Sequence, residues 1–128
     1  MILLDSSVVI DLFRAHDDRI LDVILEHDAA ICGITRAEVL YGARDVSHRV
    51  KLIAALDLFQ SVSLPEAIWD QIGDNLAVLR ASGVTVPLAD AIIATVAMTN
   101  DVELWARDQH FPLIGQVIPA LKLFKEAS

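Results

Sequence analysis

Short apolar runs alternate with longer amphipathic stretches along the chain. A run of three or four apolar residues predicts a buried strand, whereas apolar residues three and four positions apart predict a helix with one buried face. Strands are therefore expected at 2–4, 29–32, 61–64, 102–106 and, as a last edge strand, 115–118. Helices are expected to begin near Ser6, Asp17, Thr35, Ser47, Pro65 and Leu88, with a loose tail from Lys122 to Ser128.

The order of these elements predicts an α/β fold with a short, mainly parallel central sheet. Parallel strands need crossover connections, and helices in those crossovers cover both faces of the sheet. The helix expected at 88–98 is apolar nearly all round, which is typical of a buried central helix. No linker, internal repeat or low-complexity segment interrupts the pattern, so we expect a single domain over residues 1–128.

The composition favours a cytoplasmic protein that has a partner. Hydrophobic residues make up 55% of the chain and the mean hydropathy is +0.51, so we expect another chain to cover part of the apolar surface. No apolar run reaches the roughly 18 residues that span a bilayer. The first residues lack the pattern of a signal peptide, and a single cysteine, Cys32, cannot form an internal disulfide.

The net charge of −8 and the pI of about 4.7 argue against one class of function. A protein that binds nucleic acid non-specifically needs a basic face, and this charge balance does not support one. A nuclease is still compatible with the charge, because its acidic residues would be concentrated at a metal site.

Four acidic residues, Asp5, Glu38, Asp90 and Asp108, follow apolar segments or lie just inside the helices after them. In an α/β sheet this placement gathers side chains into a crevice at the carboxyl ends of the strands. Crowded carboxylates either have raised pKa values or need a cation, and a hard divalent ion held by oxygens is the simplest choice. The pattern therefore favours a metal-dependent phosphodiester hydrolase.

Each acid also fits a local structural role. Asp5 could cap the first helix, Asp90 would complement a helix macrodipole, and Asp108 could cap the turn at 109–111. Thr35 and Glu38 have the spacing of a capping box. The four histidines show no metal-ligand spacing, and Cys32 fits a small core position.

Four segments that carry these acids together resemble one known family. The segments are Leu3–Leu12, Thr35–Ala43, Pro87–Ala94 and Leu104–Phe111. In order and spacing they are similar to the motifs of PIN-domain ribonucleases, in particular the VapC-type toxins of toxin–antitoxin pairs. The resemblance implies a PIN-like three-layer sandwich, endoribonuclease activity with Mg²⁺ or Mn²⁺, a homodimer, and inhibition by a cognate antitoxin.

The resemblance also assigns roles to particular residues. Asp5 and Asp90 would be the principal metal ligands, and Glu38 and Asp108 would complete the site. Arg36 and Arg107, each close in sequence to a site acid, are candidates for contact with RNA phosphate.

The chain departs from the family pattern at Ala106. The family often has threonine or serine two residues before the last aspartate, and this position is alanine here. Ser6 is then the nearest hydroxyl that could support the site.

Two other functions fit parts of the sequence. A phospho-receiver domain also binds Mg²⁺, but it needs adjacent acids after the first strand, where Asp5 is followed by two serines. Its phosphoacceptor should end a strand, whereas Asp57 lies in an expected helix. The second alternative is a PIN-like interaction module that has lost catalysis.

Overall fold

The computed structural model describes residues 1–126, and the sheet within them has four strands that are all parallel. The strands are β1 (Ile2–Leu4), β2 (Ala29–Cys32), β3 (Gln60–Val62) and β4 (Glu103–Trp105). Their order across the sheet is β3-β2-β1-β4, and Leu3 aligns with Ala30 on one side and Leu104 on the other. The chain thus proceeds outward from β1 to β3 and then crosses to β4. The boundary between β1 and β4 is therefore the switch point at which α/β proteins form a crevice.

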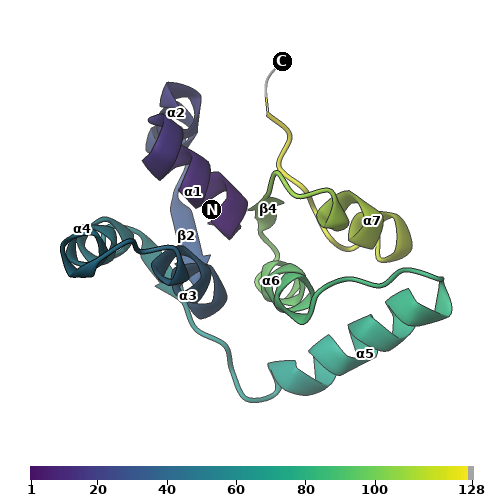
Figure 1. The fold of residues 1–128 in the computed structure, drawn as a ribbon. Helices are drawn as coiled ribbons and strands as arrows, with labels where there is room; N and C mark the ends of the chain where they lie inside the picture. Colours follow the sequence, from purple (N-terminus) through teal and green to yellow (C-terminus); the bar gives the residue numbers. More distant parts are fainter. Residues whose placement is uncertain (127–128) are drawn as a thin grey trace.

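Seven helices lie in two groups on the two sides of this sheet (Figure 1). The first group is α1 (Ser6–Ala15), α2 (Asp18–Glu26), α3 (Gly33–Tyr41) and α4 (Val46–Leu56). The second group is α5 (Ile68–Ala81), α6 (Leu88–Thr99) and α7 (His110–Val117). These counts refer to residues 1–126, and they confirm the expected α/β fold with helices on both faces.

Alternation along β1 produces two separate cores. Ile2 and Leu4 pack against the first group of helices, whereas Leu3 packs against the second. Helix α6 is the centre of the second core, because every residue from Asp90 to Ala97 is buried. An apolar helix of this kind was predicted at 88–98, and its burial fixes the position of Asp90 beside the sheet.

The predicted edge strand at 115–118 is wrong. Residues up to Val117 belong to α7, whose buried side chains Phe111 and Ile114 are three positions apart. A short apolar run does not distinguish a strand from a buried helix, and here the packing of one helical face decides the outcome.

The predicted loose tail is also wrong over its described part. Leu123 pairs with Leu104, and the Phe124 amide donates to the Leu104 carbonyl at 2.9 Å. These residues cover the outer edge of β4. Such pairing depends on residues far apart in the sequence, so a local pattern could not reveal it. Residues 127–128 of the predicted tail lie outside the described residues.

Within residues 1–126, no helix combines the length and the apolar character that crossing a membrane requires.

Candidate functional site

Asp5 lies at the switch point, directly after β1. Its amide donates to the Trp105 carbonyl at 2.9 Å, which joins the ends of β1 and β4. Its carboxylate also caps α1, because Oδ2 accepts from the Ser7 amide at 3.2 Å and from the Ser7 hydroxyl at 2.7 Å. The expected capping role is therefore present, in a residue that is only 4% exposed. Capping engages Oδ2 and leaves Oδ1 as the oxygen available to a ligand.

Asp90 lies in the first turn of α6, with its side chain buried among apolar residues. Burial, together with the charges of Asp108 and Asp5, raises the pKa of Asp90 to about 6. A hydrogen bond from His110 partly offsets these effects. Metal-binding carboxylates commonly show this kind of crowding when no cation is present.

Asp108 and His110 bring the loop after β4 to the same place. Asp108 Oδ1 accepts from the His110 amide at 2.8 Å, so the predicted capping of this turn is confirmed. The His110 ring nitrogen Nδ1 lies 2.9 Å from Asp108 Oδ1 and 2.8 Å from Asp90 Oδ2. One ligand atom from each of Asp90, Asp108 and His110 lies within 4.8 Å of the others.

Sequence reasoning missed His110. The histidines have no regular spacing from one another, and the partner of His110 is an aspartate 20 residues away on another helix. The available signal was the position of His110 two residues after Asp108, at the start of α7 and just beyond the loop that follows β4.

Glu38 completes the acidic group from α3. Its Oε1 accepts from the Ser6 hydroxyl at 3.1 Å. Burial raises the pKa of Glu38, the Ser6 hydrogen bond lowers it, and the charges of Asp5 and Asp108 raise it again. The charges of Asp5 and Asp108 raise the pKa values of both Glu38 and Asp90, so the four predicted acids share one electrostatic environment.

The capping box expected at Thr35 and Glu38 does not form. Helix α3 begins at Gly33, which places Thr35 inside the helix. The Thr35 hydroxyl is buried and donates to the Leu4 carbonyl at 3.0 Å. A tertiary contact to β1 thus replaces the local one, and it leaves Glu38 free to face Ser6.

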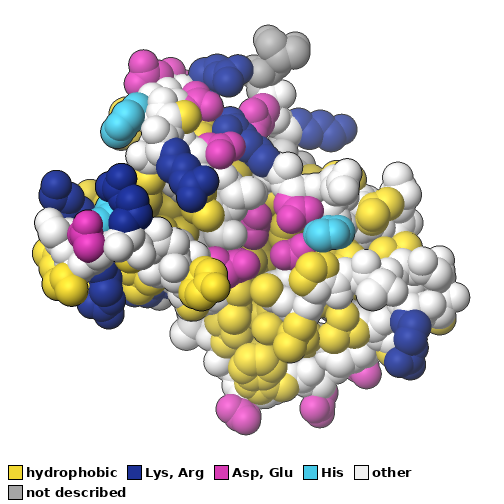
Figure 2. Space-filling view, viewed as in Figure 1, with side chains coloured by type: hydrophobic (Ala, Val, Ile, Leu, Met, Phe, Trp, Pro, Cys, Tyr) yellow, Lys and Arg dark blue, Asp and Glu magenta, His cyan; other side chains and the backbone are white. Residues whose placement is uncertain are grey.

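The donor set fits a hard divalent cation. It consists of carboxylate oxygens and one imidazole, and Cys32 takes no part because it is buried in the second core. Carboxylates with waters are the usual ligands of Mg²⁺ and Mn²⁺. Figure 2 shows acidic side chains and a histidine together at the centre of one face.

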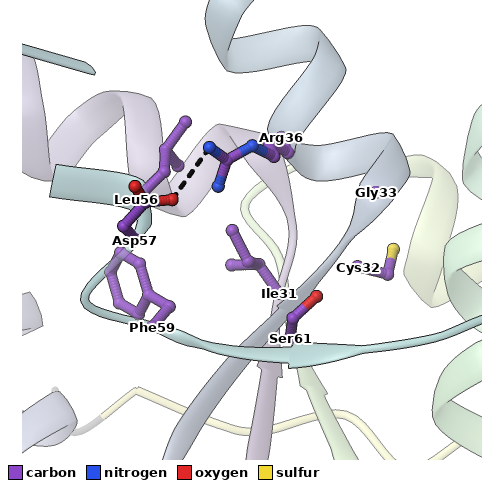
Figure 3. Close-up of a pocket in the computed structure, with 8 residues that line it drawn as sticks. All are labelled: Ile31, Cys32, Gly33, Arg36, Leu56, Asp57, Phe59 and Ser61. Carbon is purple, nitrogen blue, oxygen red and sulfur yellow. Dashed lines mark ion pairs between the residues drawn. The ribbon is translucent and has the colours of Figure 1, made fainter. Parts of the chain in front are cut away.

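The two arginines considered for phosphate contact are paired elsewhere. Arg36 Nη2 lies 2.9 Å from Asp57 Oδ1, beside a cavity of about 170 Å³ between β2, β3 and the end of α4 (Figure 3). None of the four acids lines this cavity. Arg107 forms ion pairs with Glu126, Asp11 and Asp17, and these acids raise its pKa above the usual value. Its guanidinium also lies over the Trp105 ring. A phosphate role for either residue remains a prediction.

Solved structures with a similar fold include several toxin–antitoxin proteins. A chain of DNA-bound VapBC from Salmonella typhimurium is 18% identical over 98% of both chains, with a TM-score of 0.82. A chain of a toxin–antitoxin complex from Klebsiella pneumoniae is 24% identical over 99% of this chain and 100% of the other, with a TM-score of 0.73. VapC20 from Mycobacterium tuberculosis, a sarcin–ricin-loop-cleaving toxin, is 15% identical over 90% of this chain and 95% of the other, with a TM-score of 0.71.

At these identities the likeness shows a shared fold. No curated protein matches the sequence significantly. The family model of the PIN domain matches residues 2–116, which is nearly the whole chain and includes all four acids of the site. The chain belongs to the PIN domain family.

Proposed function

We propose that this protein is a metal-dependent endoribonuclease and the toxin of a toxin–antitoxin pair. The observation that carries the proposal is the gathering of Asp5, Glu38, Asp90 and Asp108 at the switch point, where burial and mutual charge raise the pKa of Asp90 to about 6. A site of this kind binds a cation strongly, because the cation removes the repulsion between the carboxylates.

In this proposal Asp5 Oδ1 and Asp90 hold Mg²⁺ or Mn²⁺, and Glu38 and Asp108 complete the site directly or through water. A divalent ion there would activate water and neutralise charge on a phosphodiester. His110 keeps the Asp90 and Asp108 carboxylates close together through its ring nitrogen. Ser6 holds Glu38 in place through its hydroxyl.

An antitoxin partner is supported by exposed apolar side chains beside a groove. Leu12, Phe13, Leu21 and Leu58 contribute to a groove of about 350 Å³ that α1, α2 and the segment after α4 form together. Leu58 is 87% exposed and Leu21 is 44% exposed. We propose that an apolar segment of the antitoxin occupies this groove. Similar folds occur in toxin–antitoxin complexes, which is consistent with this partner.

A homodimer is a further part of the proposal. Leu88, at the start of α6, and Trp69, at the start of α5, are 58% and 46% exposed. On the face drawn in Figure 2, an apolar patch lies next to the acidic centre. A second copy of the chain would bury this patch. We place the protein in the cytoplasm, where an RNA substrate and an antitoxin would both be available.

The alternatives fit the structure less well. Asp57 is the C-cap of α4 and pairs with Arg36, so it cannot serve as a phosphoacceptor at the end of a strand. An interaction module without catalysis would keep the fold, but it would not need three further acids gathered near a buried Asp90.

Cleavage of a mixed RNA pool by the purified protein with Mg²⁺ or Mn²⁺ tests the nuclease. Cleavage should disappear with EDTA and in Asp5→Asn, while Ser47→Ala, an exposed substitution on α4, should retain it. Undiminished cleavage by Asp5→Asn would remove the metal-site proposal. Absence of cleavage in a folded, antitoxin-free sample would favour either the interaction module or a very narrow RNA specificity.

Expression of the chain alone tests the toxin. Growth should stop when the wild-type protein is induced and should continue with Asp5→Asn, since the variant keeps the fold but lacks a metal ligand. Equal growth inhibition by both proteins would show that the toxicity does not come from the acidic site.

A further inference from the structure

The Ser7 hydroxyl joins the two strand ends that flank the site. It donates to Asp5 Oδ2 at 2.7 Å and accepts from the Arg107 amide at 3.0 Å, across 100 residues of sequence. One side of this bridge is the carboxylate that follows β1. The other side is the loop after β4, which carries Asp108 on the next residue.

Both ends of the bridge are held by other contacts. The Asp5 amide is bonded to the Trp105 carbonyl at 2.9 Å. The Arg107 side chain is anchored through Asp11 at 2.8 Å and Glu126 at 2.8 Å. The loop is therefore fixed on its outer side by Arg107 and on its inner side by Ser7.

The bridge also determines which oxygen of Asp5 faces the site. Oδ2 receives two hydrogen bonds from Ser7, one from its amide and one from its hydroxyl. Without the hydroxyl, Oδ2 would keep only the weaker amide contact at 3.2 Å, and the Arg107 amide would lose its partner. The carboxylate would then rotate more freely, and the loop with Asp108 could shift away from it.

We propose that Ser7 is a positioning residue that holds the Asp5 carboxylate at a fixed position relative to the loop that carries Asp108. The sequence predicts Ser6 as a supporting hydroxyl, and Ser6 bonds the site acid Glu38. Ser7 is a second hydroxyl, which bonds Asp5. The role in catalysis rests on the proposed metal-dependent nuclease.

Mn²⁺ titration by calorimetry, with Ser7→Ala, Ser7→Thr, Ser7→Val and Ser47→Ala, tests this role. Substitution of a residue that orients a metal ligand typically lowers the affinity for the metal by about 10–100-fold. Ser7→Ala should weaken Mn²⁺ binding by about 10-fold or more, and Ser7→Val should behave similarly. Ser7→Thr keeps the hydroxyl and nearly the shape of valine, so it should stay within a few-fold of wild type. Ser47→Ala should match wild type.

Hydrogen exchange of the Arg107 amide provides a second measurement that needs no metal. Its protection should fall in Ser7→Ala and Ser7→Val and persist in Ser7→Thr. A residue that only stabilises the start of α1 would lower the melting temperature without exposing this distant amide. Alanine is the best helix former, so the Ala variant should fold. If it does not, the Thr and Val pair makes the same comparison.

The outcomes separate this inference from the proposed function. If wild type binds Mn²⁺ and Ser7→Ala binds it equally well, the positioning role is overturned while the nuclease proposal stands. If wild type neither binds Mn²⁺ nor cleaves RNA, the proposed function fails. Exchange at Arg107 then still decides whether Ser7 couples the two strand ends, and unchanged protection in Ser7→Ala would overturn the coupling.

Discussion

At the scale of single residues, Asp90 is a carboxyl that the fold holds buried and close to other acids. The carboxyl is buried at the start of a helix that the core holds in place. This burial is the main cause that raises its pKa to about 6, and the nearby charges of Asp108 and Asp5 contribute. The folded protein therefore binds a proton at Asp90 more tightly than the unfolded chain, whose value is near 3.8.

Asp90→Asn should stabilise the metal-free protein at neutral pH. Because the folded pKa is raised, the free energy of unfolding falls as the pH rises from 3.8 to about 6 and stays lower above that range. Asparagine never acquires the charge, so the variant should be more stable by about 1–2 kcal/mol at pH 7 and less dependent on pH. Urea unfolding in EDTA from about pH 4 to about pH 7 measures both effects. A variant that is less stable than wild type, with the same pH dependence, would contradict this interpretation.

The residues of the site differ in how far the sequence could predict them. Asp5, Glu38, Asp90 and Asp108 were visible because each follows an apolar segment, and the structure brings them together. His110 and Ser7 were not visible, because their roles depend on contacts with residues 20 and 100 positions away. Local patterns contain no signal for such contacts.

At the scale of elements, the C-terminal tail supports the site although the sequence predicted it to be loose. The tail pairs with β4 at Leu123, and Glu126 accepts hydrogen bonds from both Trp105 and Arg107. These contacts fix the loop that leads to Asp108. The prediction of a loose tail failed because the chain returns to a strand about 20 residues earlier.

Phe124→Ala should destabilise the protein although the residue lies near the C-terminus. The Phe124 ring packs on Trp105, with ring centroids 4.9 Å apart, and on His27 at 5.9 Å. Loss of a partly buried aromatic side chain costs about 2–3 kcal/mol. Urea unfolding of this variant beside Lys125→Ala, an exposed neighbour, measures the difference. Equal stability of the two variants would mean that the tail does not hold β4 in place.

Arg107 and Arg36 should respond differently to alanine substitution. Arg107 is partly buried and holds three acids from separate segments, so Arg107→Ala should cost about 2 kcal/mol. Arg36 forms one exposed pair with Asp57, and its loss should cost less than about 1 kcal/mol. Denaturant unfolding gives both values. If Arg107→Ala kept full stability and lost RNA binding, the phosphate-contact role would be favoured over the structural one.

At the scale of the whole molecule, the fold concentrates acidic charge at one edge of its sheet. The order β3-β2-β1-β4 places the switch point between the first and the last strand, so residues from both ends of the sequence meet there. The α/β class, the parallel sheet and the buried helix α6 were predictable from hydrophobic periodicity. Element boundaries and the identity of α7 were not, because packing between distant segments determines them.

Divalent metal should raise the thermal stability of the whole protein. An ion that binds only the folded state contributes about 1.4 kcal/mol when its concentration is about ten times Kd. For a domain of this size, that corresponds to a rise in melting temperature of roughly 3–6 °C. Scanning calorimetry with Mg²⁺ or EDTA measures the shift, and Asp90→Asn should abolish most of it. An equal shift in wild type and Asp90→Asn would place the ion elsewhere.

The most direct test of the central claim is to locate Mn²⁺ in crystals of the wild-type protein by anomalous diffraction. The account requires a peak within bonding distance of carboxylate oxygens of Asp5 and Asp90, with Asp108 and Glu38 close enough to complete the site. It also requires that the peak be lost in Asp5→Asn crystals. A peak confined to other acids, or no peak at saturating Mn²⁺, would contradict a metal centre at the switch point.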